Sequence, residues 1–313
     1  MAVFKLLVDM YYCLAKLHVR FIFRDLNFQL LKGIGAFSFF VFLNMMTDTL
    51  NYSVDKFVLG MVKGTTNIAI YSVGASLNQY YISFSSAIST VFIPRVNRLI
   101  SAGESNRTLS ELFIRIGRLQ YLVISLIFSG FVIFGRSFIT IWAGNGYENA
   151  YYVALVIMLP TTVPLIQNIS IEIQRAKNLH KFRSVTYLCI ALGNFAISIQ
   201  LAKFFGEIGS AVGTGIATTL GNIVIMNIYN YKVVGLDIPQ FWKQIGRMTL
   251  PIVTVMLLGL VGVHFVNLKN YLTLLPCILV YCVLYAGILW MTVMNDSEKQ
   301  LVQSMLGKFR KRT

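Results

Sequence analysis

Apolar residues dominate the chain in stretches long enough to cross a bilayer, with short polar connections between them. About 20 helical residues span the hydrocarbon core. Eight stretches meet that length, with limits near 32–59, 67–94, 112–142, 150–174, 184–205, 208–231, 248–268 and 271–293. The pattern therefore predicts an all-α, polytopic membrane protein with about eight transmembrane helices.

The first of these stretches carries polar residues that a lipid-facing helix would not. Asn44, Asp48, Asn51 and Asp55 follow at intervals of four, three and four, so they share one face of a helix. Carboxylates at membrane depth normally face a bundle interior or a wet cavity. These four residues, with Lys56, are the predicted cavity or ion-coupling groups. We expect Lys56 to face the outer water; the family resemblance given below implies a diphosphate as the alternative.

The second span is rich in small hydroxyl residues and contains Asn78 and Gln79. Such side chains either let membrane helices approach closely or line a cavity, and both interpretations stay open. Asn78 and Gln79 therefore join the cavity candidates. Pro94 is expected to end this span, which places Arg95 just inside the cytoplasm.

The fourth span combines a kink with a polar face. Pro160 and Pro164 predict a bend, and Asn168, Glu172 and Arg175 then fall on one face. Glu172 and Arg175 either form an ion pair at the interface, or Arg175 meets an anionic substrate. Together with Arg95, these three residues are the predicted contacts for a substrate entering from the cytoplasm.

The later spans carry fewer chemical signals. The sixth has small residues four apart, which indicate tight packing against a neighbouring helix rather than a sliding surface: Gly209, Gly213, Ala217 and Gly221. The seventh and eighth spans are almost purely apolar. They are predicted to be peripheral, lipid-facing helices without a site.

Composition and charge agree with a membrane protein. The 313 residues are 56% hydrophobic and 12% charged, whereas a soluble domain carries about twice that charged fraction. The mean hydropathy is +0.68. The net charge of +15 would suggest nucleic acid in a soluble protein, but the spans leave no room for a basic soluble domain. No nucleic-acid partner is expected.

The basic residues also predict the orientation. With the N-terminus in the cytoplasm, 22 Lys and Arg residues fall on the cytoplasmic side and five on the other. Cytoplasmic loops of membrane proteins accumulate these residues, so both termini are predicted to be cytoplasmic. The four cysteines and three histidines show no metal-ligand spacing, and no P-loop, GxSxG or HExxH motif occurs. Neither a metal site nor a cofactor is expected.

Five segments in order resemble the Wzx-type polysaccharide or O-antigen repeat-unit flippases, within the multidrug/oligosaccharidyl-lipid/polysaccharide exporter superfamily. They are NYSVDKFVLGMVKGTTNIAIYSVG (51–74), STVFIPRVNRLISAGE (89–104), ITIWAGNGYENAYYVALVIMLP (139–160), EIQRAKNLHKFRS (172–184) and GEIGSAVGTGIATTLGNIVIMNIYNYKVVG (206–235). The resemblance covers about residues 28–245. It implies two six-helix lobes, as in the multidrug-and-toxin extruders, that face each other across a central cavity.

The resemblance also implies a domain organisation. Residues 1–27 would be a cytoplasmic or interfacial lead-in, left from a preceding helix and linker. Residues 28–235 would be the C-terminal six-helix lobe, 236–295 two additional transmembrane helices, and 296–313 a basic cytoplasmic tail. On this mapping, an N-terminal lobe would be missing from this chain. A truncated gene, an internal start, and a half that pairs with a second chain are the alternatives.

The implied function is transport rather than catalysis. The chain would flip lipid-linked (undecaprenyl-diphosphate) oligosaccharides across the bacterial inner membrane for surface polysaccharide biosynthesis, by alternating access and with ion coupling. Its partners would be that lipid-linked oligosaccharide, the lipid bilayer, and an N-terminal-lobe chain or polysaccharide assembly proteins. Three alternatives stay open: a cation or drug antiporter of the same superfamily, a polysaccharide polymerase or ligase, and a non-functional fragment. Short outer loops argue against the polymerase or ligase.

Overall fold

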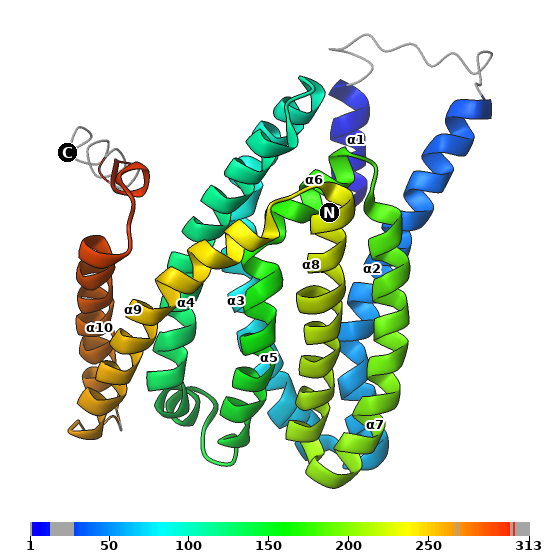
Figure 1. Cartoon of the computed structure of the whole chain (residues 1–313). Coiled ribbons are helices and arrows are strands. Elements are labelled where there is room, and N and C mark those ends of the chain that lie inside the picture. Colours follow the sequence, from blue (N-terminus) through cyan, green and yellow to red (C-terminus); the bar gives the residue numbers. More distant parts are fainter. Residues whose placement is uncertain (1, 13–27, 267, 269, 301–302, 304–313) are drawn as a thin grey trace. The chain divides into compact units, whose positions relative to one another are not determined.

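The structure, a computed structural model, describes residues 2–12, 28–266, 268, 270–300 and 303. The regular elements in these residues are helices (Figure 1). Their bounds are α1 Ala2–Tyr11, α2 Phe28–Val62, α3 Thr65–Ser101, α4 Asn106–Ala143, α5 Asn149–Ile166, α6 Asn168–Ala176, α7 His180–Thr218, η2 Thr219–Ile225, α8 Met226–Tyr229, η3 Asn230–Val234, α9 Ile238–His264 and α10 Tyr271–Thr292.

The predicted fold class is confirmed. The described part of the chain is all-α, and five of its helical stretches are long and apolar enough to cross a membrane. One of these, Lys181–Val234, is 54 residues long and accounts for two predicted spans because it doubles back on itself. Helices α2 and α3 have the length but are not among the five. Many hydroxyl and amide side chains lower the hydropathy of α3.

Contacts divide the chain into two units, Met1–Phe42 and Leu43–Thr313. The first unit contains α1 and the beginning of α2. Helix α1 exposes Leu6, Met10 and Tyr11, which suits a helix that lies against an apolar phase. Residues 13–27 of the expected lead-in lie outside the described residues. The predicted boundaries at residues 27, 235 and 295 stay predictions.

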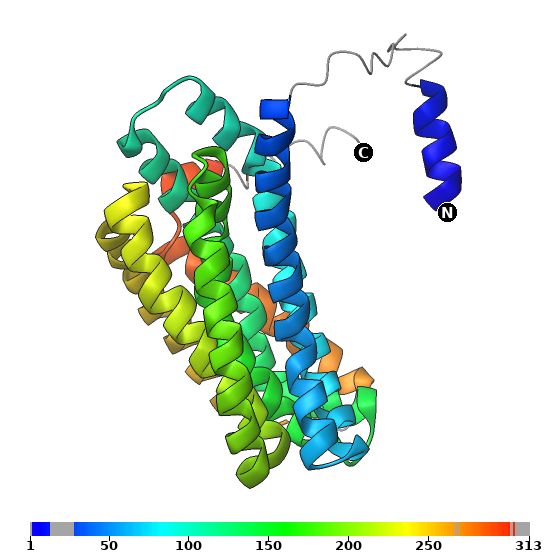
Figure 2. The same ribbon diagram turned by 90° about the vertical axis from the view of Figure 1, so that its right-hand side faces the viewer.

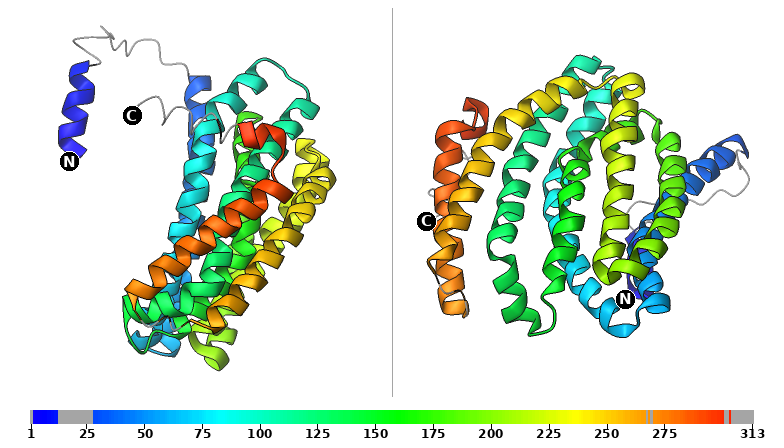
Figure 3. Two further views of the ribbon diagram at one scale, coloured as in Figure 1. Left: turned by 90° about the vertical axis from the view of Figure 1, so that its left-hand side faces the viewer. Right: turned by 60° about the horizontal axis from the view of Figure 1, so that its bottom comes forward.

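In the second unit, long helices run alternately between two ends (Figures 1 and 2). The connections 102–105, 177–179 and 235–237 lie at one end, which we call the basic end. The connection 63–64, the connection 144–148 and the turn at Gly206 lie at the opposite end. Figure 3 shows α9 and α10 on the opposite side of α4 from α7. The polar helices α3, α5, α6 and α7 are thereby grouped together.

Helix α3 does not end at Pro94, so that prediction is wrong. The helix continues to Ser101, with Pro94 inside it. Proline removes one backbone hydrogen bond and typically costs about 3 kcal/mol within a helix. Val96 lies beyond Pro94 and is fully buried in the largest apolar core. Tertiary packing therefore holds the last turns in helical form.

The predicted kink in the fourth span is present as a break between two helices. Helix α5 ends at Ile166, Gln167 adopts φ −105° and ψ 9°, and α6 starts at Asn168. Because α5 ends here, carbonyl groups of its last turn have no continuing helix to accept from and need other partners. Ser85 of α3 supplies one, since its Oγ donates to the Leu165 carbonyl at 2.8 Å. The break is thus tied to α3.

The glycine stripe of the sixth span packs tightly, as predicted. Helix α7 turns back at Gly206, whose φ of 59° suits glycine. Positions at nearly equal distances from Gly206 then meet across the hairpin. A Cβ added at Gly213 would overlap Ser198, and one at Gly221 would lie 2.8 Å from Ile190 Cδ1. Only small residues allow so close an approach.

Helices α9 and α10 present one apolar face outward and pack the other against α4. Leu272 is 87% exposed and Leu250 75%, as the prediction of lipid-facing helices requires. On the inner face, Tyr281 donates a hydrogen bond to Ser129 Oγ at 2.7 Å. Phe113 of α4 stacks on Phe241 of α9, with ring centroids 4.7 Å apart. The pair therefore covers the α4 surface that faces away from the polar helices.

Candidate functional site

A cavity of about 790 Å³ lies among α3, α5, α6, α7 and η2. Five residues predicted from the sequence line it: Asn78, Gln79, Asn168, Glu172 and Arg175. The second span is therefore a cavity wall as well as a packing surface, which resolves the two interpretations left open above. The lining runs from Arg175 near the basic end to Tyr71 and Thr214 deeper in the bundle. We call this space the polar cavity.

The other predicted residues whose side chains the structure describes do not line the polar cavity. Arg95 is exposed at the basic end of α3. It lies two residues beyond the lining residue Ile93, and two helical steps turn it by about 200°. Lys56 is half-buried and also lies outside the lining. The side chains of Asn44, Asp48 and Asn51 lie outside the described residues.

Asp55 is fully buried, with 0% exposed surface, and does not line the polar cavity. This corrects its predicted place. Both of its oxygens accept hydrogen bonds from hydroxyl groups. Oδ2 accepts from Tyr71 at 2.5 Å and Thr214 at 2.6 Å, and Oδ1 accepts from Ser210 at 2.7 Å and Ser198 at 3.2 Å. Such hydrogen bonds offset the cost of burying a carboxylate.

Asp55 nevertheless borders the cavity through its partners. Tyr71 and Thr214, which donate to Oδ2, are themselves lining residues. The carboxylate thus lies one side chain behind the deep end of the wall. The α7 hairpin makes this arrangement, because Ser198 precedes Gly206 and Ser210 follows it. Close packing at Gly213 brings both hydroxyls to the same carboxylate. We call Asp55 and its four hydroxyl partners the Asp55 cluster.

The cations near the basic end differ in how they are used. Arg175 Nη1 donates to Glu172 Oε1 at 2.7 Å, so the ion pair anticipated from the sequence is present. Lys177 ties together the beginning of α4 and the end of η3, donating to Asn106 Oδ1 at 2.7 Å and to the Val234 carbonyl at 2.9 Å. Partial burial lowers the pKa of Lys177.

Two buried polar atoms of the cavity lining have no hydrogen-bond partner among the described residues. They are Asn78 Oδ1, an acceptor, and Arg183 Nε, a donor. Unpaired buried polar atoms are rare, because each costs about 1–3 kcal/mol. Both of these unpaired atoms belong to side chains that line the polar cavity.

Four further residues line the polar cavity that were not among the predicted site residues: Arg183, Tyr187, Thr214 and Asn222. A signal was present in the fifth span. Arg183, Tyr187, Asn194 and Ser198 are spaced by four, seven and four residues, so they share one helical face. It continues across the hairpin, where Asn194 donates to Thr214 Oγ1 at 3.3 Å.

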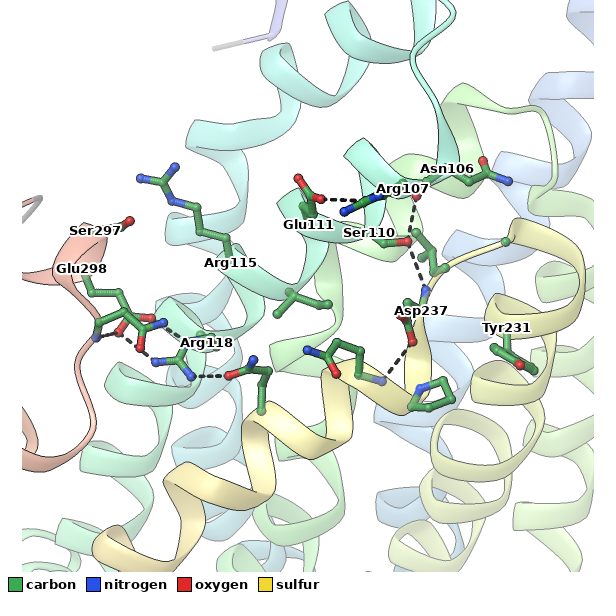
Figure 4. Close-up of a pocket in the computed structure, with 17 residues that line it drawn as sticks. Asn106, Arg107, Ser110, Glu111, Arg115, Arg118, Tyr231, Asp237, Ser297 and Glu298 are labelled. Atoms are coloured by element: carbon green, nitrogen blue, oxygen red, sulfur yellow. Dashed lines mark hydrogen bonds and ion pairs between the residues drawn. The ribbon is translucent and has the colours of Figure 1, made fainter.

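A second hollow, of about 1200 Å³, lies at the basic end between α4, α9 and the segment after α10 (Figure 4). At its edge, Arg118 of α4 is only 5% exposed. Its Nε and Nη2 donate to the two oxygens of Glu298 at 2.7 and 3.0 Å. It also donates to Gln244 Oε1 at 3.0 Å and the Val293 carbonyl at 3.1 Å.

These contacts give the second hollow a structural role. The Arg118 guanidinium joins α4, α9 and the end of α10, and Glu298 neutralises its charge. Arg107 is likewise paired with Glu111, at 3.3 Å. No predicted site residue with a described side chain lines this hollow. The polar cavity is therefore the candidate functional site.

The fold and the polar cavity define a helical, multi-pass membrane protein with a polar space inside the bundle. Residues 1–152 match the sequence model of a family described as "Polysaccharide biosynthesis protein". Over that part of the chain, the match supports the resemblance to Wzx-type flippases. It indicates a role in polysaccharide biosynthesis or export. No curated protein and no solved structure matches the chain.

Proposed function

We propose that the chain forms one wall of a flippase for lipid-linked oligosaccharides in the bacterial inner membrane, with its basic end in the cytoplasm. The supporting observation is the polar cavity, which has an arginine-bearing mouth and a buried carboxylate behind its deep end. A diphosphate with attached sugars cannot cross hydrocarbon unaided, because desolvating its charges costs far too much. A cavity with donors and acceptors replaces part of that lost hydration.

Alternating access supplies the mechanism of this proposal. The cavity first opens toward the cytoplasm and accepts the head group, while the lipid tail stays in the bilayer. The lobes then rock so that the same cavity opens outward. The chain provides one set of helices, and a second lobe provides the facing wall. Undecaprenyl diphosphate is the proposed lipid carrier, and O-antigen or a related surface polysaccharide is the product.

The Asp55 cluster is the proposed ion-coupling site. The cluster contains one carboxylate and four hydroxyl groups. The carboxylate can accept a proton, and its oxygens and the hydroxyl oxygens are hard ligands for Na⁺. A cation arriving there would turn hydroxyl oxygens toward itself, and Tyr71 and Thr214 would then shift at the cavity wall. Ion binding and cavity shape are linked in this way through two shared side chains.

The test is the variant Asp55→Asn in the host that makes the polysaccharide. Asparagine keeps the size of the side chain but removes its charge, so we expect surface polysaccharide to fall at least tenfold while membrane insertion stays normal. Asp296→Asn is the matched control, because Asp296 is an exposed carboxylate away from the cavity. We expect this control to leave polysaccharide unchanged.

Two results would overturn the proposal. Full polysaccharide assembly by a normally inserted Asp55→Asn protein would remove the carboxylate from the mechanism. Resistance to cationic drugs that depends on the chain, with polysaccharide unchanged when the chain is deleted, would favour the antiporter instead.

A further inference from the structure

We propose that Arg183, rather than Arg175, binds the diphosphate of the substrate in the polar cavity. This inference rests on the proposed function, because it assigns one group within the same cavity. The ligand class is a phosphate or diphosphate anion, either as a lipid head group or free in solution. Both arginines line the cavity, so the distinction between them comes from their partners.

Arg175 already has an anion. Its guanidinium lies 2.7 Å from Glu172 Oε1, and the two residues are one helical turn apart. A phosphate at Arg175 would have to displace this carboxylate or share the guanidinium with it at close range. Like charges so close repel each other, so binding there is weakened. The Glu172–Arg175 pair is therefore close to neutral as seen by an approaching anion.

Arg183 has no carboxylate partner among the described residues. Its guanidinium carbon lies 4.7 Å from the ring centroid of Tyr187, one turn further along α7. The aromatic face holds the charge without neutralising it. Tyr187 is itself fixed, because its hydroxyl donates to Asn222 Oδ1 across the hairpin. The cation is therefore held in place while its charge stays available.

The open donor on Arg183 points to the kind of ligand. Nε is buried and unpaired among the described residues. A guanidinium uses Nε and a neighbouring Nη as a fork that matches two oxygens of a phosphate. An anion seated there would pair Nε and remove the cost of leaving it open. Of the charged residues that line the cavity, Glu172 and Arg175 cancel, which leaves Arg183 as the net charge.

The experiment measures anion binding to the full chain in nanodiscs made of zwitterionic lipid. The probes are inorganic pyrophosphate and farnesyl diphosphate, each titrated by calorimetry into wild type, Arg183→Gln, Arg183→Lys and Arg175→Gln. We expect Arg183→Gln to raise Kd at least tenfold for both probes. A further variant, Glu172→Gln combined with Arg175→Gln, should change Kd less than threefold, because it removes both members of a pair that is neutral as a whole. Arg183→Lys keeps the charge but loses the paired Nε and Nη donors, so its Kd should lie between those of wild type and Arg183→Gln.

The outcomes separate the possible sources of the anion. Equal affinities for both probes indicate a site for the diphosphate itself, and tighter binding of farnesyl diphosphate indicates a lipid head group. In nanodiscs that also contain phosphatidylglycerol, we expect the Kd for pyrophosphate to stay the same. This lipid is a phosphodiester without a second phosphate group, so it should not compete for the site. A thermal melt of each variant identifies misfolding, and Arg183→Lys keeps the test valid if the glutamine variant does not fold.

The inference is overturned if wild type binds neither probe, or if Arg175→Gln loses binding while Arg183→Gln keeps it. These results are distinct from failure of the proposed function. Binding that depends on Arg183, in a chain whose deletion leaves surface polysaccharide intact, would keep the anion site and reject the flippase. Polysaccharide that needs Asp55 but tolerates Arg183→Gln would keep the flippase and reject this site.

Discussion

Two buried charged side chains, Asp55 and Arg118, show what the sequence reveals at the scale of single residues. Asp55 was marked by its position on the polar face of an apolar helix. Its hydroxyl partners Ser198, Ser210 and Thr214 could not be predicted, because they lie 143 to 159 residues away. Helical spacing identifies which residues share a face but not which distant helix will cover that face. The cavity-lining prediction for Asp55 failed for this reason.

Arg118 gives the clearest prediction about stability. Replacing one partner of a buried ion pair leaves the other charge without compensation, which typically costs about 3–5 kcal/mol. We expect Arg118→Met to lower the unfolding free energy by about that amount, because Glu298 is only 3% exposed. The double variant Arg118→Met with Glu298→Leu should recover most of the loss. Urea unfolding in detergent measures both.

The matched control is Arg107→Met. Arg107 pairs with Glu111 on the same helix, but both side chains are exposed, at 89% and 68%. Exposed pairs contribute at most about 1 kcal/mol. An Arg118→Met protein as stable as the Arg107→Met protein would show that the contact with Glu298 does not hold α10 to α4.

At the scale of elements, apolar length predicted the helices well and their ends poorly. Helices α3, α4 and α9 all extend past the predicted spans at the basic end, to Ser101 and from Asn106 and Ile238. Hydropathy detects only the part of a helix that lies in hydrocarbon. Proline and glycine were informative when they fixed local geometry. They predicted the break after α5 and the close packing along the second half of α7. Pro94 did not mark the end of α3, which continues to Ser101.

The α7 hairpin supplies the prediction at this scale. A methyl group at Gly213 would overlap Ser198. Either the two halves move apart, or the Ser198 hydroxyl rotates away from Asp55. Overpacking of this kind typically costs about 1–3 kcal/mol, so we expect Gly213→Ala to lower the unfolding temperature and to reduce surface polysaccharide. Circular dichroism on heating, with a polysaccharide assay in cells, measures both effects.

Gly193→Ala on the same helix is the control. A Cβ at Gly193 meets nothing within 4 Å, so alanine there should be neutral or stabilise the helix by up to about 1 kcal/mol. If Gly213→Ala and Gly193→Ala unfold at the same temperature, the hairpin has room for a methyl group at Gly213. The close approach then does not position Ser198.

At the scale of the whole molecule, the distribution of basic residues and the alternation of the connections agree. The helix ends that carry many Lys and Arg residues, on either side of the connections 102–105, 177–179 and 235–237, lie at one end of the second unit (Figure 1). Composition was sufficient for the fold class, because a chain so poor in charge must fold in lipid. It could not place the polar cavity, which depends on how α3, α5, α6 and α7 pack. Five of the predicted residues line that cavity because their helices already carried a polar face.

The proposed function requires that water reach the polar cavity from the basic end. The direct measurement is the reaction of single cysteines with a charged, membrane-impermeant thiol reagent added from that side, in a chain whose native cysteines are replaced. Ser86→Cys and Thr218→Cys place the thiol in the cavity lining, and Ser129→Cys places it in the buried contact with α10. We predict rapid labelling at the first two positions and none at the third. If Ser86→Cys and Thr218→Cys are as unreactive as Ser129→Cys, the cavity is closed to water, which contradicts the proposed passage.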